Sequence, residues 1–401
     1  MSKDSERGGG PGGRKAALRY FLRHGPVAIA ASSLPGAVSY AVVLYLSYRY
    51  EAADAGAYRL VLSAFSLLGL IAVSEASKVL IRSFAQDDHA SVESLFLNRL
   101  FFAGAALALM GLAALVSELA GRPLVPWQYL VAGAFAVIYY PLDSYQSFYK
   151  ARSNFDALFL TEFLKYGAAF AAFMGVLETG GGVLAATLAQ LAVMSLAHLI
   201  VFCRTMARYI DWRRCWTRLR AQFFNPQARE ARNISYGAIL PGALEHIDKF
   251  IIGAVFGLEA LGLYVLGFST GRFIYNALKP GFYIYYKRFV TRMPGRRAVV
   301  AVLVGFTVLG AGLAAAFLTA VHLVPAMDRF QGAEGVTVIL FLSYGIGMAD
   351  ALFTQAYAIN EKTDSRHITV ANTWSSLACL ALFAAAALAP VGVALLMFAA
   401  H

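Results

Sequence analysis

The sequence predicts an all-α, polytopic membrane protein with two pseudo-symmetric bundles of about six transmembrane helices each, the last helix being short or truncated. Three observations predict this class. Of 401 residues, 59% are hydrophobic and 14% are charged, whereas a soluble domain is about a quarter charged. Apolar runs long enough to cross a hydrocarbon core of about 30 Å recur along nearly the whole chain. The sequence also repeats its own landmarks at an offset of 206 residues.

The internal repeat is carried by three ungapped matches at one offset. The matched segments are LPGA at 34–37 and 240–243, the Gly-x-Tyr-x-Leu pattern at 56–60 and 262–266, and the arginines at 82 and 288. A single tetrapeptide match would mean little in so apolar a chain. A shared offset of about half the chain length indicates two copies of one unit.

Eleven apolar spans follow a Gly-rich, basic tail at residues 1–23. The first lobe, 24–204, holds spans 24–47, 56–80, 97–117, 127–149, 156–177 and 182–204. A linker follows at 205–232, and the second lobe, 233–401, holds spans 234–256, 259–284, 298–323, 336–358 and 367–388. The apolar end at 390–401 makes only about 18 Å of helix at 1.5 Å per residue, so the twelfth helix is either truncated or half-inserted.

The distribution of basic residues predicts the orientation of the spans. With the N-terminus in the cytoplasm, 26 of the 34 lysines and arginines fall on the cytoplasmic side, as the positive-inside rule requires. This placement accounts for the net charge of +11, so we expect a membrane-lipid environment and no nucleic-acid partner. The odd count of three cysteines implies no disulfide framework.

The linker contains a candidate interfacial helix. Between Asp211 and Arg220, Trp212, Trp216 and Leu219 share one helical face, and arginines cover much of the rest. This pattern favours a helix lying on anionic lipid. The alternative is a docking site for a partner protein.

The clearest charged face inside a span lies on the eighth. Its residues step by three and four and therefore share one side of a helix: Ser269, Arg272, Asn276, Lys279 and Tyr283. Arg272 lies about 20 Å from the start of the span, near mid-membrane, and this helix has no acid within the stripe. A guanidinium can hold a phosphate with two parallel hydrogen bonds. Ser269, Arg272, Asn276 and Lys279 are therefore candidate contacts to an anionic substrate.

Other ionisable residues within the spans are candidates for coupling or gating, because such residues are rare in hydrocarbon. On the seventh span, Glu245 and Lys249 are spaced to satisfy one another, which leaves Asp248 to pair with the eighth span or to bind a proton or cation. Lys249 is a further candidate substrate contact. Asp143 and Asp350 are additional polar points on the fourth and tenth spans. These groups could instead hold helices together, and Glu162 with Lys165 on the fifth span is interpreted in that structural way.

Several enzyme and cofactor motifs are absent from the sequence. It has no phosphate-binding Gly-x-x-x-x-Gly-Lys loop, no His-Glu-x-x-His and no Cys-x-x-Cys. We therefore predict no catalytic residue, no cofactor and no metal site. Without an ATPase domain, transport would depend on an ion gradient, a substrate gradient or the membrane potential.

Diffuse motifs along nearly the whole chain resemble one transporter family. They are Glu-His-Ile-Asp-Lys-Phe-Ile-Ile-Gly at 245–253, Leu-Gly-Leu-Tyr at 261–264, Asp-Ala-Gly-Ala-Tyr at 54–58 and Tyr-Gln-Ser-Phe-Tyr-Lys-Ala-Arg-Ser-Asn-Phe at 145–155. They resemble the Wzx-type polysaccharide-repeat flippases, which belong to the multidrug/oligosaccharidyl-lipid/polysaccharide exporter superfamily. The short last helix departs from that pattern.

The resemblance implies a V-shaped pair of six-helix bundles that alternates between inward and outward openings in a bacterial inner membrane. Its substrate would be an undecaprenyl-pyrophosphate-linked oligosaccharide for O-antigen, capsule or exopolysaccharide assembly, that is, a lipid-linked oligosaccharide. Arg272 and Lys279 would engage the pyrophosphate, and Asp248 or Glu245 would take part in coupling. A polysaccharide polymerase and glycosyltransferases are further expected partners. Two alternatives stay open: a cation-coupled multidrug exporter of the same superfamily, and a non-transporting scaffold for glycosyltransferases.

Overall fold

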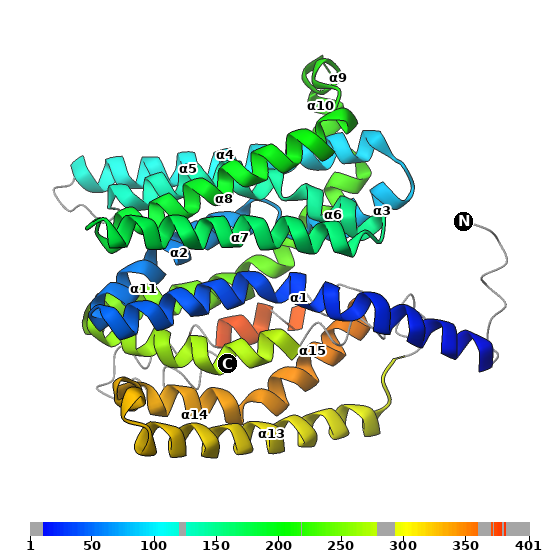
Figure 1. Cartoon of the computed structure of the whole chain (residues 1–401). Coiled ribbons are helices and arrows are strands. Elements are labelled where there is room, and N and C mark those ends of the chain that lie inside the picture. The colour runs from blue at the N-terminus through cyan, green and yellow to red at the C-terminus, as the bar shows by residue number, and fades with distance from the viewer. Residues whose placement is uncertain are drawn as a thin grey trace.

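The computed structural model describes residues 11–119, 126–217, 219–278, 293–359, 370, 371, 373–378 and 381, and its elements over these ranges are helical (Figure 1). Each of the first ten predicted spans has a helical counterpart. In order these are α1 (Pro11–Arg49), α2 (Ala52–Ile71) with α3 (Ala76–Ala85), α4 (His89–Leu119), α5 (Trp127–Leu142) with α6 (Ser144–Ala151), α7 (Phe155–Glu178), α8 (Val183–Thr205), the two limbs of α11 (Pro226–Leu278), α13 (Arg296–Leu323), and α14 (Glu334–Leu342) with α15 (Tyr344–Ile359). Most of the span 367–388 and all of 390–401 lie outside the described residues.

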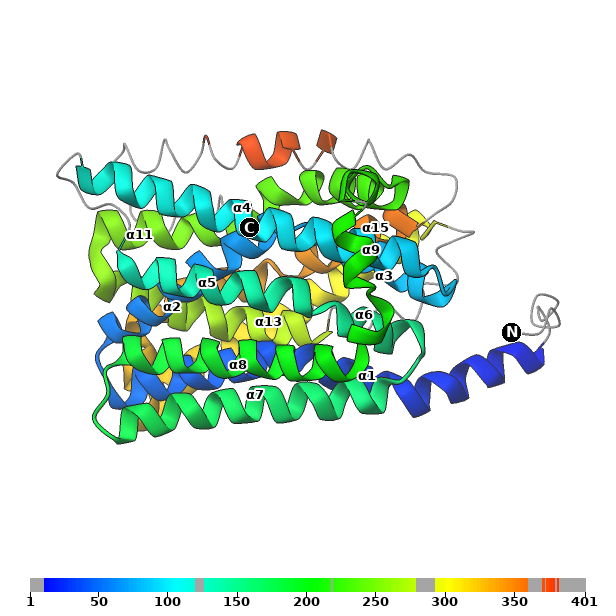
Figure 2. The ribbon, with the colours of Figure 1, turned by 90° about the horizontal axis from the view of Figure 1, so that it is seen from above.

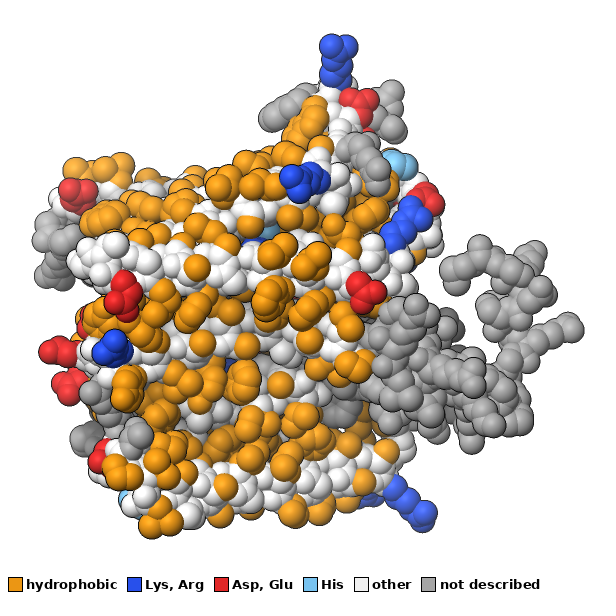
Figure 3. All heavy atoms as spheres, viewed as in Figure 1, with side chains coloured by type: hydrophobic (Ala, Val, Ile, Leu, Met, Phe, Trp, Pro, Cys, Tyr) orange, Lys and Arg blue, Asp and Glu red, His pale blue; other side chains and the backbone are white. Residues whose placement is uncertain are grey.

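The helices have the length and composition of membrane spans. Over the described ranges, seven are long and apolar enough to cross a bilayer, or eight if the bent pair Phe330–Leu342 and Tyr344–Phe353 is one span. Figure 3 shows hydrophobic side chains across the viewed face, with most charged side chains towards the two ends of the helices. Lipid-facing apolar surface between two polar ends is the arrangement that a bilayer requires. The chain is therefore a multi-pass membrane protein.

Helix α11 is a hairpin of two limbs, 226–256 and 258–278. The backbone leaves helical geometry at Gly257, where φ is 88° and ψ is 170°. Only glycine adopts this conformation readily, because it has no Cβ. Contacts between the limbs then run in antiparallel register: Tyr264 meets Asp248 and Arg272 meets Glu245. The turn thus brings the seventh and eighth predicted spans side by side.

Three spans predicted as continuous helices are broken in the structure. The span 56–80 is interrupted at residues 72–75, where Val73 has a φ of 54°. The span 127–149 breaks at Asp143, two residues after Pro141, whose carbonyl accepts a hydrogen bond from the Ser144 hydroxyl at 2.7 Å. The span 336–358 breaks at Ser343 with a bend of 42°. Proline lacks a backbone N–H and so weakens the helix around Asp143.

The two copies of the repeat contact each other through repeat-related residues. A Cβ added to Gly56 would lie 2.3 Å from the carbonyl oxygen of Leu258, and one added to Gly262 would lie 1.8 Å from that of Ala52. Gly56 and Gly262 are 206 residues apart, as are Ala52 and Leu258. Such reciprocal contact is the signature of a twofold-related interface. The N-terminal ends of α2 and of the second limb of α11 therefore meet across a pseudo-twofold axis.

The fold consists of two helical lobes joined by this contact (Figures 1 and 2). Helices α4 to α8 pack with α2 in the N-terminal lobe, and α13 to α15 pack with the second limb of α11 in the C-terminal lobe. One apolar core crosses between the lobes and includes Val43, Tyr58, Ile252 and Val265. Van der Waals packing across this shared core holds the lobes against each other.

The first turns of α11 are hydrogen-bonded to the N-terminal lobe. Helix α11 begins at Pro226, inside the stretch 205–232 that the sequence assigns to the linker. Arg232 donates to the Asn98 side chain and to the Phe223 carbonyl, and Ser235 accepts from the backbone N–H of Glu75. Before it, the candidate interfacial helix is divided into α9 (Trp212–Thr217) and α10 (Leu219–Phe223), which project sideways from the N-terminal lobe near one end of its helices (Figure 1).

Candidate functional site

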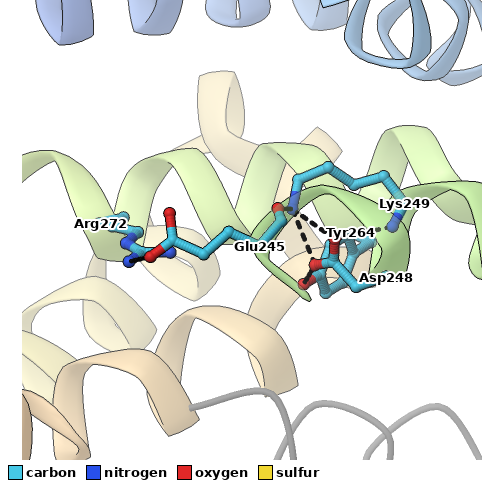
Figure 4. A network of polar contacts seen from close by, with 5 residues as sticks. All are labelled: Glu245, Asp248, Lys249, Tyr264 and Arg272. Atoms are coloured by element: carbon cyan, nitrogen blue, oxygen red, sulfur yellow. Dashed lines mark hydrogen bonds and ion pairs between the residues drawn. The ribbon is translucent and has the colours of Figure 1, made fainter. Parts of the chain in front are cut away.

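Charged side chains from both lobes gather where α2 meets the α11 hairpin. We call this group the inter-lobe cluster; its members are Arg59, Glu245, Asp248, Lys249, Tyr264 and Arg272. Arg59 comes from α2, and the other five come from the two limbs of α11 (Figure 4). Arg272 is 15 residues past the Gly257 turn, about 20 Å along the helix. The cluster therefore lies within the apolar length of the helices and away from the Gly257 turn at their end.

The exposed part of the cluster is an ion pair between the limbs. Arg272 donates to the Glu245 carboxylate at 2.6 Å, and their side chains are 21% and 51% exposed. The sequence predicts no acid within the polar stripe that contains Arg272, and the second limb of α11 indeed supplies none. The neutralising acid comes instead from the neighbouring limb, because the hairpin register sets Glu245 opposite Arg272. The partial exposure of both groups leaves this pair open to exchange with a ligand.

The sealed part of the cluster is centred on Lys249. Its ammonium donates to both oxygens of Asp248, at 2.8 and 2.7 Å, and to the backbone carbonyl of Glu245 at 2.6 Å. Tyr264 donates to the same Asp248 carboxylate. Lys249 is 0% exposed and Asp248 is 2% exposed. The spacing-based pairing of Lys249 with the Glu245 carboxylate is thus wrong: Lys249 pairs with Asp248, and Glu245 pairs with Arg272.

One aromatic ring lies among three cations. The Lys249 ammonium is 4.2 Å from the centroid of Phe268, and the guanidinium carbons of Arg272 and Arg59 are 5.2 and 6.0 Å from it. A ring face attracts a cation within about 6 Å. The cluster holds these three cations against two carboxylates, Glu245 and Asp248. It therefore carries one surplus positive charge in a low-dielectric region.

Arg59 is the functional candidate that sequence reasoning missed. It lies near the start of the predicted span 56–80 and was not among the predicted site residues. In the structure it points towards the α11 hairpin, and its Nε has no hydrogen-bond partner among the described residues. A buried donor without a partner is uncommon. The only sequence signal was an arginine one turn inside an apolar run.

The other predicted site residues are distributed more widely. Ser269 is half-buried and Asn276 is exposed on the same limb as Arg272. Lys279 lies outside the described residues, as does Tyr283. Asp350 on α15 is exposed and acts electrostatically on Tyr275 of the second limb. Asp143 pairs with the buried Arg99 at 2.5 Å within the N-terminal lobe. The structure therefore brings together Glu245, Asp248, Lys249 and Arg272, and it places Asp143 elsewhere.

The donor set of the cluster suits an anion better than a metal ion. Two arginines and a lysine offer N–H donors, and both carboxylates are already engaged by cations. No group of three or more His, Cys, Asp or Glu residues that could hold a metal ion occurs in the described part of the chain. An anion approaching Arg272 would replace Glu245 as its hydrogen-bond acceptor.

Comparisons with known proteins place these features in a family and a fold. A family model described as "Polysaccharide biosynthesis protein" matches residues 23–281. A search of curated proteins found no match. Among solved structures, an outward-facing multidrug resistance MATE family transporter of the MOP superfamily is similar, with a TM-score of 0.56, 16% identity, and coverage of 94% of this chain and 90% of that chain. The Vibrio cholerae MATE transporter VcmN in its bent form is similar with a TM-score of 0.52, 16% identity, and coverage of 96% and 93%. These structures share the two-lobe helical fold.

Proposed function

The chain belongs to the polysaccharide biosynthesis protein family, and from this premise we propose that it is a flippase for a lipid-linked oligosaccharide. The substrate is an undecaprenyl-pyrophosphate-linked repeat unit for O-antigen, capsule or exopolysaccharide assembly. The protein lies in the bacterial inner membrane with its N-terminus in the cytoplasm. A polysaccharide polymerase and glycosyltransferases act as its partners.

The observation that carries this proposal is the surplus positive charge of the inter-lobe cluster. Arg272 is partly exposed and paired with a still more exposed carboxylate, Glu245. A pyrophosphate presents several acceptor oxygens, and the planar guanidinium binds such groups with two parallel hydrogen bonds. Arg59 brings a second guanidinium from the opposite lobe. A pyrophosphate bound here would contact both lobes at once.

The proposed transport step follows from this contact. The pyrophosphate displaces Glu245 from Arg272, and the sugars occupy the space between the lobes while the lipid tail stays in the bilayer. Lys279 joins Arg272 on the pyrophosphate, and Asn276 and Ser269 extend the polar surface. Rocking of the lobes about the α2–α11 contact then changes the side from which the cluster is reached. Asp248 takes part in coupling or gating, and Lys249, predicted as a substrate contact, is 0% exposed beside it and reaches a ligand only if this pair opens.

Reconstitution tests the proposal directly. Purified protein in proteoliposomes should move a fluorescent undecaprenyl-pyrophosphate oligosaccharide between leaflets, and Arg272→Ala should slow this by tenfold or more, since a charge-assisted hydrogen bond contributes about 1.5–3 kcal/mol. Arg296→Ala is the matched control, because Arg296 is an exposed arginine at the start of α13. If folded wild-type protein does not move the lipid, the proposal is overturned. That result is also the one expected of a non-transporting scaffold. Equal rates for Arg272→Ala and Arg296→Ala overturn the role of Arg272.

A cation-coupled multidrug exporter is the second candidate. It is favoured by the half-exposed carboxylate of Glu245, which could accept a lipophilic cation if Arg272 moved away. The three cations around Phe268 oppose such a ligand. Displacement of a bound fluorescent cationic drug by inorganic pyrophosphate, and the reverse experiment, separate the two candidates.

A further inference from the structure

The short helices α9 and α10 form a projection on the N-terminal lobe that the proposed transport step does not use. We call it the linker projection; it comprises residues 211–217 and 219–224. It extends sideways from the lobe near one end of the helices, across their direction (Figures 1 and 2). Because the helices have the composition of membrane spans, an element in this position runs along the membrane surface rather than away from it.

Hydrogen bonds to α4 hold both ends of the linker projection. The buried Glu93 carboxylate accepts from the backbone N–H of Asp211 and from the Gln222 side chain, each at 3.1 Å. The Ser94 hydroxyl donates to the Gln222 carbonyl. These bonds join the residue before α9 and a residue near the end of α10 to the first turns of α4. The projection therefore keeps a fixed position relative to the N-terminal lobe.

The contacts with α4 also set the depth of the linker projection in the bilayer. The predicted span of this helix is 97–117, and Glu93 lies about one turn before it. Phe101 and Phe102 lie about one turn inside it, and their ring centroids are 5.3 and 6.0 Å from that of Phe223 in α10. The contact thus reaches about 7 Å into the span. An interfacial helix buries its apolar face to about 5–10 Å, at the boundary between headgroups and acyl chains.

The linker projection has an apolar surface that continues the lipid-facing surface of α4. Trp212, Leu219 and Phe224 are 44%, 46% and 66% exposed, and Phe101, which contacts α10, is 59% exposed. Figure 3 shows hydrophobic side chains on the side of the projection that faces the middle of the helices, and a basic side chain at its tip. Tryptophan in particular is enriched where a membrane meets water. This arrangement suits an element that is half immersed in lipid.

The same segment carries a surplus of positive charge. Between residues 211 and 224 the sequence has one acid, Asp211, and four arginines: Arg213, Arg214, Arg218 and Arg220. The Asp211 carboxylate accepts from the backbone N–H of Arg213 at 3.0 Å, at the start of α9. The side chains of Arg213 and Arg220 are exposed. Basic side chains beside an apolar face attract anionic lipid headgroups.

We propose that the linker projection is a binding site for anionic phospholipid, in which Arg213 and Arg220 contact headgroup phosphates and the exposed apolar side chains lie among the acyl chains. One open groove brings a cation and an aromatic ring together, as the phosphate and the chain of one lipid require; it is lined by Thr217, Arg220, Ala221 and Phe224. In the orientation proposed above, this lipid belongs to the cytoplasmic leaflet. Its binding does not depend on which molecule the protein carries.

Fluorescence quenching in lipid nanodiscs tests the depth of the projection. Trp212 becomes the sole tryptophan of the full chain in the variant W127F/W216F/W374F. Phosphatidylcholine brominated on its acyl chains should quench this tryptophan, and acrylamide in the water should quench it only weakly. If the variant does not fold, the emission that wild-type protein loses in W212F gives the same signal. Quenching by acrylamide without quenching by the brominated lipid overturns the proposal, because it places the projection in water, as docking of a soluble protein requires.

The same reporter tests the selectivity for anionic headgroups. The quenching of Trp212 by brominated phosphatidylglycerol and by brominated phosphatidylcholine gives the ratio of their binding constants at the projection. We expect a ratio of about ten or more, because each arginine near an anionic surface favours binding by about fivefold. R213Q/R220Q should lower this ratio by about fivefold or more, and R296Q/R297Q, the control on an exposed arginine pair of α13, should leave it unchanged. A ratio near one in the unmodified projection, or one that R213Q/R220Q does not lower, overturns the proposal.

Discussion

Replacing Gly262 with alanine tests the contact that joins the two halves of the molecule. The new Cβ would lie 1.8 Å from the Ala52 carbonyl oxygen, and in Gly56→Ala it would lie 2.3 Å from that of Leu258. Ordinary contact begins at 3.4 Å, so backbone must move by about 1.6 Å and about 1.1 Å respectively. Overpacking of this kind costs about 1–3 kcal/mol. We expect a loss of about 3 kcal/mol for Gly262→Ala and about 2 kcal/mol for Gly56→Ala.

The assay is reversible unfolding in mixed detergent micelles, with the two single variants and their double variant. Both methyl groups widen the same contact, so the double variant should lose clearly less than the two single losses combined. Gly305→Ala on α13 is the control, because nothing lies within 4 Å of its added Cβ and alanine favours a helix by about 1 kcal/mol. Wild-type stability for Gly262→Ala, or strict additivity of the two losses, would refute the reciprocal contact.

Three further predictions concern charged residues. Asp248→Asn leaves the buried Lys249 ammonium without its counter-charge and should lower the free energy of unfolding by about 3–5 kcal/mol. The D248N/K249M double variant should recover most of this loss. A loss below about 1 kcal/mol for D248N would contradict the sealed pair. Glu245→Gln removes the carboxylate that competes for Arg272, so pyrophosphate should bind about tenfold more tightly in calorimetry, and weaker binding would contradict the displacement step. Arg82→Ala breaks an ion pair exposed at both ends and should change the free energy of unfolding by less than about 1 kcal/mol.

The helical architecture could be predicted from the sequence because the length of an apolar run and the placement of basic residues at its ends are properties of a whole span and do not depend on single contacts. The two glycines of the reciprocal contact, Gly56 and Gly262, both lie in the matched segments of the repeat, although the repeat alone does not show that they meet. The break at Asp143 had a local signal in Pro141, which an apolar run conceals. The break near Val73 had none: a β-branched residue with a φ of 54° depends on tertiary packing, which outweighs local propensity.

The sequence predicted most of the residues that gather in the candidate site, but not which of them form ion pairs with each other. Spacing along one helix favours a pair between Glu245 and Lys249, but the turn at Gly257 sets Arg272 opposite Glu245. Pairing between limbs depends on the register of the hairpin, which sequence spacing does not give. Arg59 was missed for the same reason, because its contact with Phe268 joins segments about 200 residues apart.

The sign of the ligand's charge tests the central claim most directly. Equilibrium binding should be measured on wild-type protein in nanodiscs with an undecaprenyl-pyrophosphate oligosaccharide and, separately, with a lipophilic cation of similar size. We predict binding of the pyrophosphate lipid that is weakened at least tenfold in Arg272→Ala and unchanged in Arg296→Ala, with no competition from the cation. Preferential binding of the cation, or binding of the pyrophosphate lipid that Arg272→Ala leaves intact, would contradict the account.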